Sequence, residues 1–200
     1  MKITSIQTQI KNASRYSLFV DGKYTFSLSA DALLASKITV GQEVSDADIK
    51  RFKQLSDNDK AYGLALAYVA RRLRSEWELR DYCKRKGYMP TLTNEIIGKL
   101  SRSGFVDDMT FAQRWVENRR LLKATSAKKL RLELRQKRIA DDIISTVLAE
   151  DETDERQVLR ELVEKKRKQT RYRDNQKLMM YLARQGFNYD DIKAVLTTDE

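Results

Sequence analysis

The chain of 200 residues contains no histidine, one cysteine and one proline. Without histidine it cannot form a Ser-His-Asp triad, a Cys-His pair or an imidazole general base. The single thiol, Cys83, excludes an intramolecular disulfide and a structural zinc site built from four Cys or His ligands. We therefore expect no metal and no cofactor, and we interpret Cys83 as a buried packing residue.

Long apolar runs are missing as well. The longest apolar-rich stretch, residues 64–70, is far shorter than the roughly 20 residues that cross a bilayer. The amino terminus lacks the basic start and long apolar run of a secretory signal. With 41% hydrophobic and 34% charged residues, the composition is that of a globular protein. We expect a cytoplasmic monomer that does not associate with membranes.

Positive charge is plentiful and unevenly placed. The chain has 39 Lys and Arg against 29 Asp and Glu, a formal charge of +10. Residues 61–150 alone hold 19 basic and 11 acidic side chains. Such a field favours a polyanionic partner, either nucleic acid or an acidic protein groove. The alternative is that long basic side chains merely solvate helix surfaces.

Residues 1–58 have the pattern of a small β-rich domain. Two alternating segments, residues 16–20 and 23–28, flank Asp21-Gly22, which supplies the positive φ angles of a tight turn. Ser45 then precedes a short helical pattern, and Asp57-Asn58-Asp59 interrupts it. We predict a small antiparallel sheet with one or two short helices, and nothing in it suggests catalysis.

From residue 59 onward the chain is predicted to be helical and repetitive. Residues 78–88, 129–139 and 177–187 align at offsets of 51 and 48, with leucine at the second position of each. Similar apolar flanks predict three helices per copy and nine in total. The chain is therefore predicted to be mainly α, with three tandem three-helix repeats after the β-rich segment. The predicted repeats are residues 59–108, 109–150 and 151–200.

Glycine is the second-last residue in two of the three aligned segments. Gly87 and Gly186 each precede an aromatic residue, as expected where a left-handed residue terminates a helix. Arg138 occupies the same point in the middle repeat. If it adopts the same backbone conformation, the cost should be about 1 kcal/mol.

Acidic pairs could suggest metal-assisted phosphodiester chemistry. However, each pair stands at the start of a predicted helix, where carboxylates cap free amides and interact favourably with the helix dipole. The pairs are residues 107–108, 141–142 and 190–191. The chain also has no Walker-type phosphate loop and no dinucleotide fingerprint. We therefore predict that it is not an enzyme.

Trp115 falls on the repeating apolar stripe and is assigned to the core, whereas Trp77 is expected to be more exposed.

Basic residues follow the apolar stripe in two repeats but not in the third. Lys128, Arg131 and Arg135 recur beside the apolar face of their helix, and Arg80 and Lys84 match two of these positions in the first repeat. The third repeat has Met179 and Ala183 there, and its charge lies in residues 165–173 instead. This asymmetry favours a polyanion-facing surface. Its candidate residues are Arg71, Arg72, Arg74, Arg80, Lys84, Lys128, Arg131 and Arg135.

Several motifs in this order resemble the RecX family of recombination regulators. They are residues 70–79, 84–88, 104–112, 130–139 and 184–192, and the likeness spans roughly residues 60–197. The resemblance implies a bacterial, non-enzymatic modulator that lies along the groove of the RecA–DNA filament. It further implies inhibition of RecA in DNA repair, recombination and the SOS response. Arg138 departs from the glycine found at this turn in the other two copies.

Three functional hypotheses follow. The first is a RecA-filament inhibitor that uses the basic surface. The second is an autonomous helical-repeat protein that binds single-stranded or duplex DNA in a salt-dependent way. The third, a nuclease, is disfavoured by the capping explanation of the acidic pairs. No regular aromatic platform predicts base-specific readout.

Overall fold

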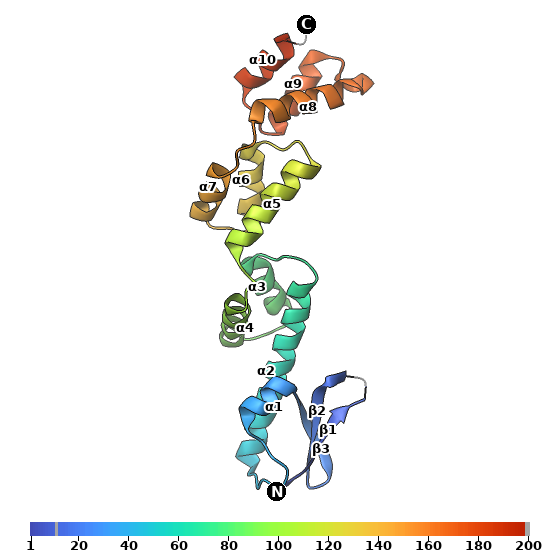
Figure 1. The fold of residues 1–200 in the computed structure, drawn as a ribbon, viewed down its shortest axis with the longest axis vertical. Coiled ribbons are helices and arrows are strands. Elements are labelled where there is room, and N and C mark those ends of the chain that lie inside the picture. The colour runs from blue at the N-terminus through green and yellow to red at the C-terminus, as the bar shows by residue number, and fades with distance from the viewer. Residues whose placement is uncertain (11, 199–200) are drawn as a thin grey trace. The chain divides into compact units, whose positions relative to one another are not determined.

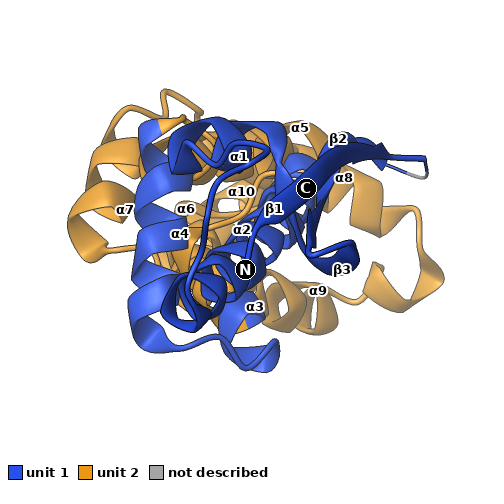
Figure 2. Ribbon diagram, turned by 90° about the horizontal axis from the view of Figure 1, so that it is seen from below, with its two compact units in different colours: residues 1–72, 82–102 blue, residues 73–81, 103–200 orange. Residues whose placement is uncertain are grey.

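The computed structural model describes residues 1–10 and 12–198 of the chain (Figure 1). These residues form two compact units, coloured blue and orange in Figure 2. The first unit comprises residues 1–72 and 82–102, and the second comprises residues 73–81 and 103–200. In the described residues there are one three-stranded sheet, ten α-helices and one short 3₁₀-helix.

The amino-terminal sheet is antiparallel with strand order β1-β2-β3. Its strands are β1 (Ile3–Gln9), β2 (Asn12–Val20) and β3 (Lys23–Ser29). Asp21 and Gly22 have φ angles of 48° and 78°, which confirms the predicted hairpin turn. The core beneath the sheet includes fully buried Leu18 and Leu28.

Helix α2 (Asp46–Ala70) follows α1 (Ala30–Ser36) and runs without interruption through residues 57–59. The predicted break at this point is therefore wrong. The Asp59 carboxylate accepts hydrogen bonds from the Ser29 amide at 2.9 Å and the Ser29 hydroxyl at 2.6 Å. It also pairs with Arg15 at 2.9 Å. The acidic residue thus joins the helix to the sheet instead of ending the helix.

Eight further helices complete the three three-helix domains, so the predicted mainly helical fold is confirmed. They are α3 (Glu76–Arg85), α4 (Pro90–Arg102), α5 (Asp108–Leu122), α6 (Ala127–Gln136), α7 (Asp141–Ala149), α8 (Glu155–Arg167), α9 (Asn175–Arg184) and α10 (Tyr189–Thr198), with the 3₁₀-helix η1 (Thr170–Tyr172) before α9.

The middle helix of each repeat buries two aligned side chains completely, the leucine at the second aligned position and the residue four positions later. Cys83 on α3, Leu134 on α6 and Leu182 on α9 have no exposed surface. This confirms that Cys83 is a core residue equivalent to the two leucines. Trp115 packs against the core of the second repeat and Trp77 is 42% exposed, both as predicted.

The three middle helices end in the same left-handed conformation. Gly87 has a φ angle of 74° and Gly186 one of 90°, and Arg138 adopts 59°. In the turns after α6 and α9, the next amide bonds back across the turn, from Ile139 to the Leu134 carbonyl at 3.1 Å and from Phe187 to the Leu182 carbonyl at 3.4 Å. Arg138 therefore does adopt the left-handed conformation of the two glycines, the case for which the sequence predicts a cost of about 1 kcal/mol.

Within the second unit, two serines link successive middle helices. The Ser75 hydroxyl accepts from the Glu78 amide at 3.3 Å and donates to the Lys137 carbonyl, at the end of α6, at 3.1 Å. The Ser126 hydroxyl accepts from the Lys129 amide and donates to the Gln185 carbonyl, at the end of α9, at 2.7 Å. Each serine thus caps its own helix and holds the end of the next middle helix.

A second bond accompanies each serine. The Glu76 amide donates to Asp108 Oδ1 at 2.7 Å, and the Ala127 amide donates to Glu155 Oε1. Asp108 and Glu155 are the first residues of α5 and α8. Because both serines and both carboxylates recur one repeat apart, we name these contacts the first junction (Ser75, Glu76, Asp108, Lys137) and the second junction (Ser126, Ala127, Glu155, Gln185).

The corresponding cap in the third repeat is Asp174, whose carboxylate accepts from the Lys177 amide at 3.1 Å. An ionised aspartate accepts hydrogen bonds but cannot donate one. The third repeat therefore has a cap for its own helix without the donor that the two serines provide.

Candidate polyanion-binding surface

The eight predicted contact residues are divided between the two units. Arg71, Arg72 and Lys84 belong to the first unit, and the other five belong to the second. Lys128, Arg131 and Arg135 share helix α6, and Arg80 and Lys84 share helix α3, whose residues are divided between the two units. Neither unit holds the whole predicted set, and the α6 residues are the largest group that lies on one helix within one unit.

On α6 the basic residues lie beside a fully buried apolar stripe formed by Leu130 and Leu134. Lys128 and Arg135 are exposed, and Arg131 is half-buried. This is the arrangement that helical spacing predicts. The helix therefore uses one face for the core of the second repeat and presents cations next to it.

Two of these arginines contact helix α7. Arg135 Nε donates to Asp141 Oδ1 at 2.7 Å, and Arg131 Nη1 donates to Ser145 Oγ at 3.2 Å. The bond from Arg135 lowers the pKa of Asp141, and the same bond raises the pKa of Arg135. Both side chains of the Arg135–Asp141 pair are more than half exposed, so solvent screens it and a phosphate can compete for the guanidinium.

Arg80, the equivalent of Arg131 in the first repeat, also has a local partner. Its Nη2 atom lies 2.7 Å from Glu76 Oε1, one helical turn earlier. Pairs at this spacing contribute only a few tenths of a kcal/mol when exposed. Arg80 is thus partly neutralised in the free protein. Arg74, another of the predicted contact residues, is half-buried.

In the first unit, the exposed Arg71 lies near an aromatic pair. The rings of Tyr68 and Tyr82 stack with centroids 4.2 Å apart, and Lys86 Nζ lies 5.8 Å from the Tyr82 ring centroid. Burial raises the pKa of Tyr82, whereas the charge of Arg71 acts to lower it. Sequence reasoning missed this pair because its members come from different helices, α2 and α3.

The third repeat has no cation at the two positions that match Arg131 and Arg135. Met179 and Ala183 stand there on α9. Instead, Lys166 on α8 places its Nζ atom 4.7 Å from the ring centroid of Tyr181 and 5.4 Å from that of Tyr172. Sequence reasoning noted the charges of this segment but missed the tyrosines around Lys166.

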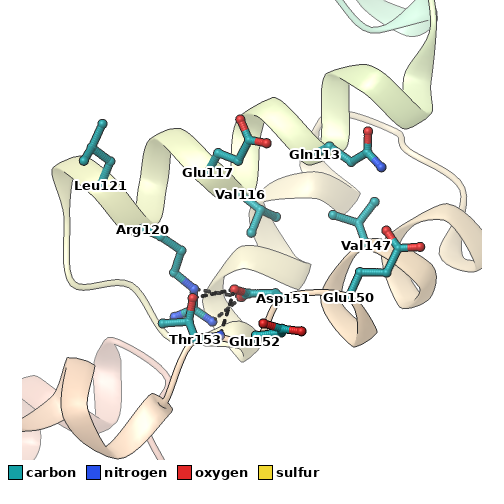
Figure 3. A pocket seen from close by; sticks show the side chains of 10 residues that line it. All are labelled: Gln113, Val116, Glu117, Arg120, Leu121, Val147, Glu150, Asp151, Glu152 and Thr153. Carbon is teal, nitrogen blue, oxygen red and sulfur yellow. Dashed lines mark hydrogen bonds and ion pairs between the residues drawn. The ribbon is translucent and has the colours of Figure 1, made fainter.

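A hollow beside α5 and the segment after α7 is lined mainly by acidic side chains, in contrast to the basic face of α6 (Figure 3). Arg120 reaches across it to Asp151 Oδ2 at 2.7 Å, while the other charged side chains that line it are Glu117, Glu150 and Glu152. Burial acts to raise the pKa of Asp151, but hydrogen bonds from Thr153 and Arg120 outweigh it and leave that pKa lowered. Its carboxylates make this hollow unsuitable for a polyanion.

The acidic pairs lie at helix starts, as predicted. Asp107 accepts from the amides of Met109 and Thr110, and Asp141–Asp142 and Asp190–Asp191 lie in first turns. Among residues 1–10 and 12–198, no group of three or more His, Cys, Asp or Glu side chains is arranged to hold a metal ion. None of the helices described there is both long enough and apolar enough to span a membrane.

Family models match nearly the whole chain. A model of the RecX amino-terminal domain matches residues 1–45, and models of the first, second and third RecX three-helix domains match residues 61–106, 107–148 and 153–196. The chain belongs to the RecX family. This family is regulatory and non-catalytic.

RecX relatives cover most of the chain. The regulatory protein RecX of Bacillus subtilis is 33% identical over 199 residues, which are 97% of this chain and 75% of that protein. RecX of Listeria monocytogenes is 30% identical over 203 residues, covering 98% of this chain and 75% of the relative.

Two solved structures have the same fold. A crystal structure of regulatory protein RecX covers 100% of this chain and 99% of its own, with a TM-score of 0.81 and 24% identity. A RecX structure from Lactobacillus salivarius covers 71% of this chain and 96% of its own, with a TM-score of 0.61 and 26% identity.

Proposed function

We propose that this chain is a non-enzymatic regulator that binds the RecA–DNA filament and inhibits the ATPase and recombinase activities of RecA. Membership of the RecX family carries the proposal, because the family name points to RecA as the partner. Three tandem helical repeats suit a filament, since an array of repeats can make many modest contacts along an extended partner.

The α6 cations are the contact residues with the strongest support. Lys128 and Arg135 are exposed beside the core stripe, and the Arg135–Asp141 pair is open to competition by phosphate. Arg71, Arg72, Arg74, Arg80 and Lys84 complete the proposed contact set. Neutralising phosphates with these side chains would make binding weaken as salt rises.

The test is DNA-dependent ATP hydrolysis by RecA with the full chain titrated in. We expect inhibition by the unaltered protein and a loss of roughly tenfold or more in potency for the double variant Arg131→Glu, Arg135→Glu. The matched control is Lys50→Glu, Lys53→Glu, which makes the same change in net charge at two exposed α2 residues. The control should inhibit as the unaltered chain does.

Unchanged ATP hydrolysis at one chain per few RecA subunits would reject the proposed function. Equal inhibition by the α6 variant and the unaltered chain would reject the α6 residues as contacts while leaving RecA as the partner. Because Arg135→Glu brings two carboxylates together at Asp141, thermal unfolding of each variant must accompany the titration. The neutral pair Arg131→Gln, Arg135→Gln provides a second measurement without that repulsion.

A further inference from the structure

The acidic hollow beside α5 and the segment after α7 has a volume of about 650 Å³ and lies within the second unit (Figure 3). Val116 and Val147 line it from the core of the second repeat and form its apolar floor. Leu121, which also lines it, is 82% exposed. The hollow therefore offers apolar surface that a side chain of a partner can cover.

Carboxylates surround this apolar floor. They belong to Glu117, Glu150, Asp151 and Glu152. Arg120 is the one cation among the described residues that line the hollow, and Asp151 already holds it at 2.7 Å. Glu150 and Glu152 are exposed and form no ion pair with a cation of residues 1–10 and 12–198. The uncompensated charge of the hollow is therefore negative, in a chain whose net charge is +10.

The outer face of α6 has the complementary pattern. Lys128, Leu132 and Arg135 lie at positions i, i+4 and i+7 of this helix, and all three are exposed, Leu132 by 56%. Arg135 donates to Asp141 through Nε, which leaves its Nη groups to donate to a second carboxylate. An apolar side chain thus stands between two cations on α6, whereas the hollow has an apolar floor among carboxylates. Such matched patterns favour docking of one surface on the other.

These two surfaces cannot meet within one chain. The opposite face of α6 packs Leu130 and Leu134 into the same core that holds Val116 and Val147. The helix and the hollow are therefore fixed parts of one small three-helix domain, and the outer face of α6 points away from its core. A contact between the α6 face and the hollow requires a second copy of the chain.

We propose that the hollow binds the α6 face of a second copy, with Leu132 covering the apolar floor and Lys128 and Arg135 facing Glu150 and Glu152. Because the two surfaces differ, the contact is head-to-tail and joins further copies in a row or a ring.

This self-association does not depend on RecA, but it has a consequence for the proposed function. The contact covers α6, to which that function assigns binding of the RecA–DNA filament. A copy whose α6 face is covered in this way cannot use it toward a filament. Self-association therefore holds free chains in a masked form that must dissociate before α6 can act.

The test is sedimentation velocity of the full chain over a range of concentrations. We expect the weight-average sedimentation coefficient to rise with concentration at low salt and to rise less at about 0.5 M salt, because salt screens exposed charges. The double variant Glu150→Lys, Glu152→Lys should associate roughly tenfold or more weakly. The matched control is Glu43→Lys, Glu95→Lys, which makes the same change in net charge at two exposed residues of the first unit. The control should associate as the unaltered chain does.

A mixing experiment tests whether the two surfaces pair with each other. The variant Lys128→Glu, Arg135→Glu reverses the charge of the α6 face and should also lose association by itself. Mixing it with the hollow variant should restore association, because opposite charges then face one another at every contact between the two variants. Thermal unfolding accompanies the measurement, since Arg135→Glu brings two carboxylates together at Asp141. Leu132→Gln leaves the charges unchanged and should weaken association roughly tenfold through the loss of apolar burial.

A sedimentation coefficient that does not change with concentration would overturn the inference. Equal losses in the hollow variant and in the Glu43, Glu95 control would assign the effect to net charge and overturn it as well. A mixture that fails to associate would overturn the pairing of the two surfaces. Equally strong competition by polylysine would show a site for any cationic chain and overturn the second copy as its occupant.

RecA ATPase inhibition is a separate readout. The hollow variant should inhibit at least as strongly as the unaltered chain, because its α6 face is no longer covered. Weaker inhibition by this variant would overturn the masking of α6. Self-association of a chain that leaves RecA ATPase unchanged would support the contact and reject only the proposed function.

Discussion

The first and second junctions contain the same two kinds of hydrogen bond, but the bond from the serine hydroxyl is longer in the first junction than in the second. The Ser75 hydroxyl lies 3.1 Å from the Lys137 carbonyl, whereas the Ser126 hydroxyl lies 2.7 Å from the Gln185 carbonyl. The residue after each of these turn carbonyls differs too, since Arg138 follows Lys137 and Gly186 follows Gln185. A Cβ atom built on Gly186 would lie 2.6 Å from Ser126 Oγ. The first junction, which has the longer serine bond, is therefore the one in which a residue with a side chain, Arg138, occupies the position of Gly186.

The junction carboxylates differ in their cations. Glu155 receives Arg120 Nη2 at 3.1 Å in addition to the Ala127 amide. Asp108 receives the Glu76 amide but pairs with no cation of the described residues, and burial raises its pKa. Instead, the first junction has its charged pair elsewhere, between Lys137 and Glu78 at 2.9 Å. The two junctions therefore share the same hydrogen bonds between side chains and backbone, and they differ in their charged pairs.

The largest expected effect breaks the second junction. Gly186→Ala should reduce the free energy of unfolding by about 3 kcal/mol, from left-handed strain and the displaced Ser126 hydroxyl. Urea unfolding followed by circular dichroism measures it. Gly87→Ala is the control, since its φ angle is also positive but no atom lies within 4 Å of its added Cβ, and it should cost only about 1 kcal/mol. Equal costs would contradict the steric explanation.

Removing the serine hydroxyls compares the two junctions directly. Ser126→Ala should cost about 2 kcal/mol and Ser75→Ala about 1 kcal/mol, because each leaves an amide and a carbonyl without a partner and the shorter bond is the stronger. Both serines are fully buried, so exposure does not confound the comparison. Urea unfolding of the two variants in parallel tests the order, and a larger cost for Ser75→Ala would refute it.

Placing glycine at position 138, next to the first junction, should stabilise the chain. Arg138→Gly relieves a φ angle of 59° in a non-glycine residue and should raise the free energy of unfolding by about 1 kcal/mol. Arg138→Ala keeps the strain without the charge and serves as the control. A gain for the alanine variant equal to that of the glycine variant would assign the effect to charge instead.

The smallest effect is a difference in pH dependence. Because the folded pKa of Asp108 is raised, the stability it contributes is complete below the ordinary value of 3.8 and is lost as pH rises through the folded value. Asp108→Asn should remove this loss while keeping an acceptor for the Glu76 amide. Asp151 has a lowered pKa, so its contribution is present above 3.8 and is lost as pH falls through its folded value. Thermal unfolding of both asparagine variants across acidic pH should show opposite slopes relative to the parent.

Much of the fold was predictable because its signals are local. Asp21-Gly22 identified the hairpin, and the repeating leucines and terminal glycines located the middle helices. The continuity of α2 was not predictable, since the partners of Asp59 are Ser29 and Arg15, which are distant in the sequence. Asp59 belongs to a polar run that locally predicts a helix break. The contacts that keep Asp59 within the helix form only in the folded chain.

The candidate surface was predictable in position but not in pairing. Helical spacing placed Lys128 and Arg135 beside the apolar stripe, whereas the bond from Arg135 to Asp141 depends on how α7 follows the turn. The junction serines did have a sequence signal, namely serine at equivalent positions of two repeats. Their bonds to the next repeat could not be read from that signal, because capping alone explains a serine before a helix.

The aspartate at position 174 makes the three repeats non-interchangeable modules. If the second and third repeats exchanged places, its carboxylate would face a turn carbonyl at an internal boundary, acceptor against acceptor. A permuted chain with the same helices and the same cores would therefore lose one inter-module bond. An engineered fourth module would meet the same obstacle unless position 174 carried a hydroxyl.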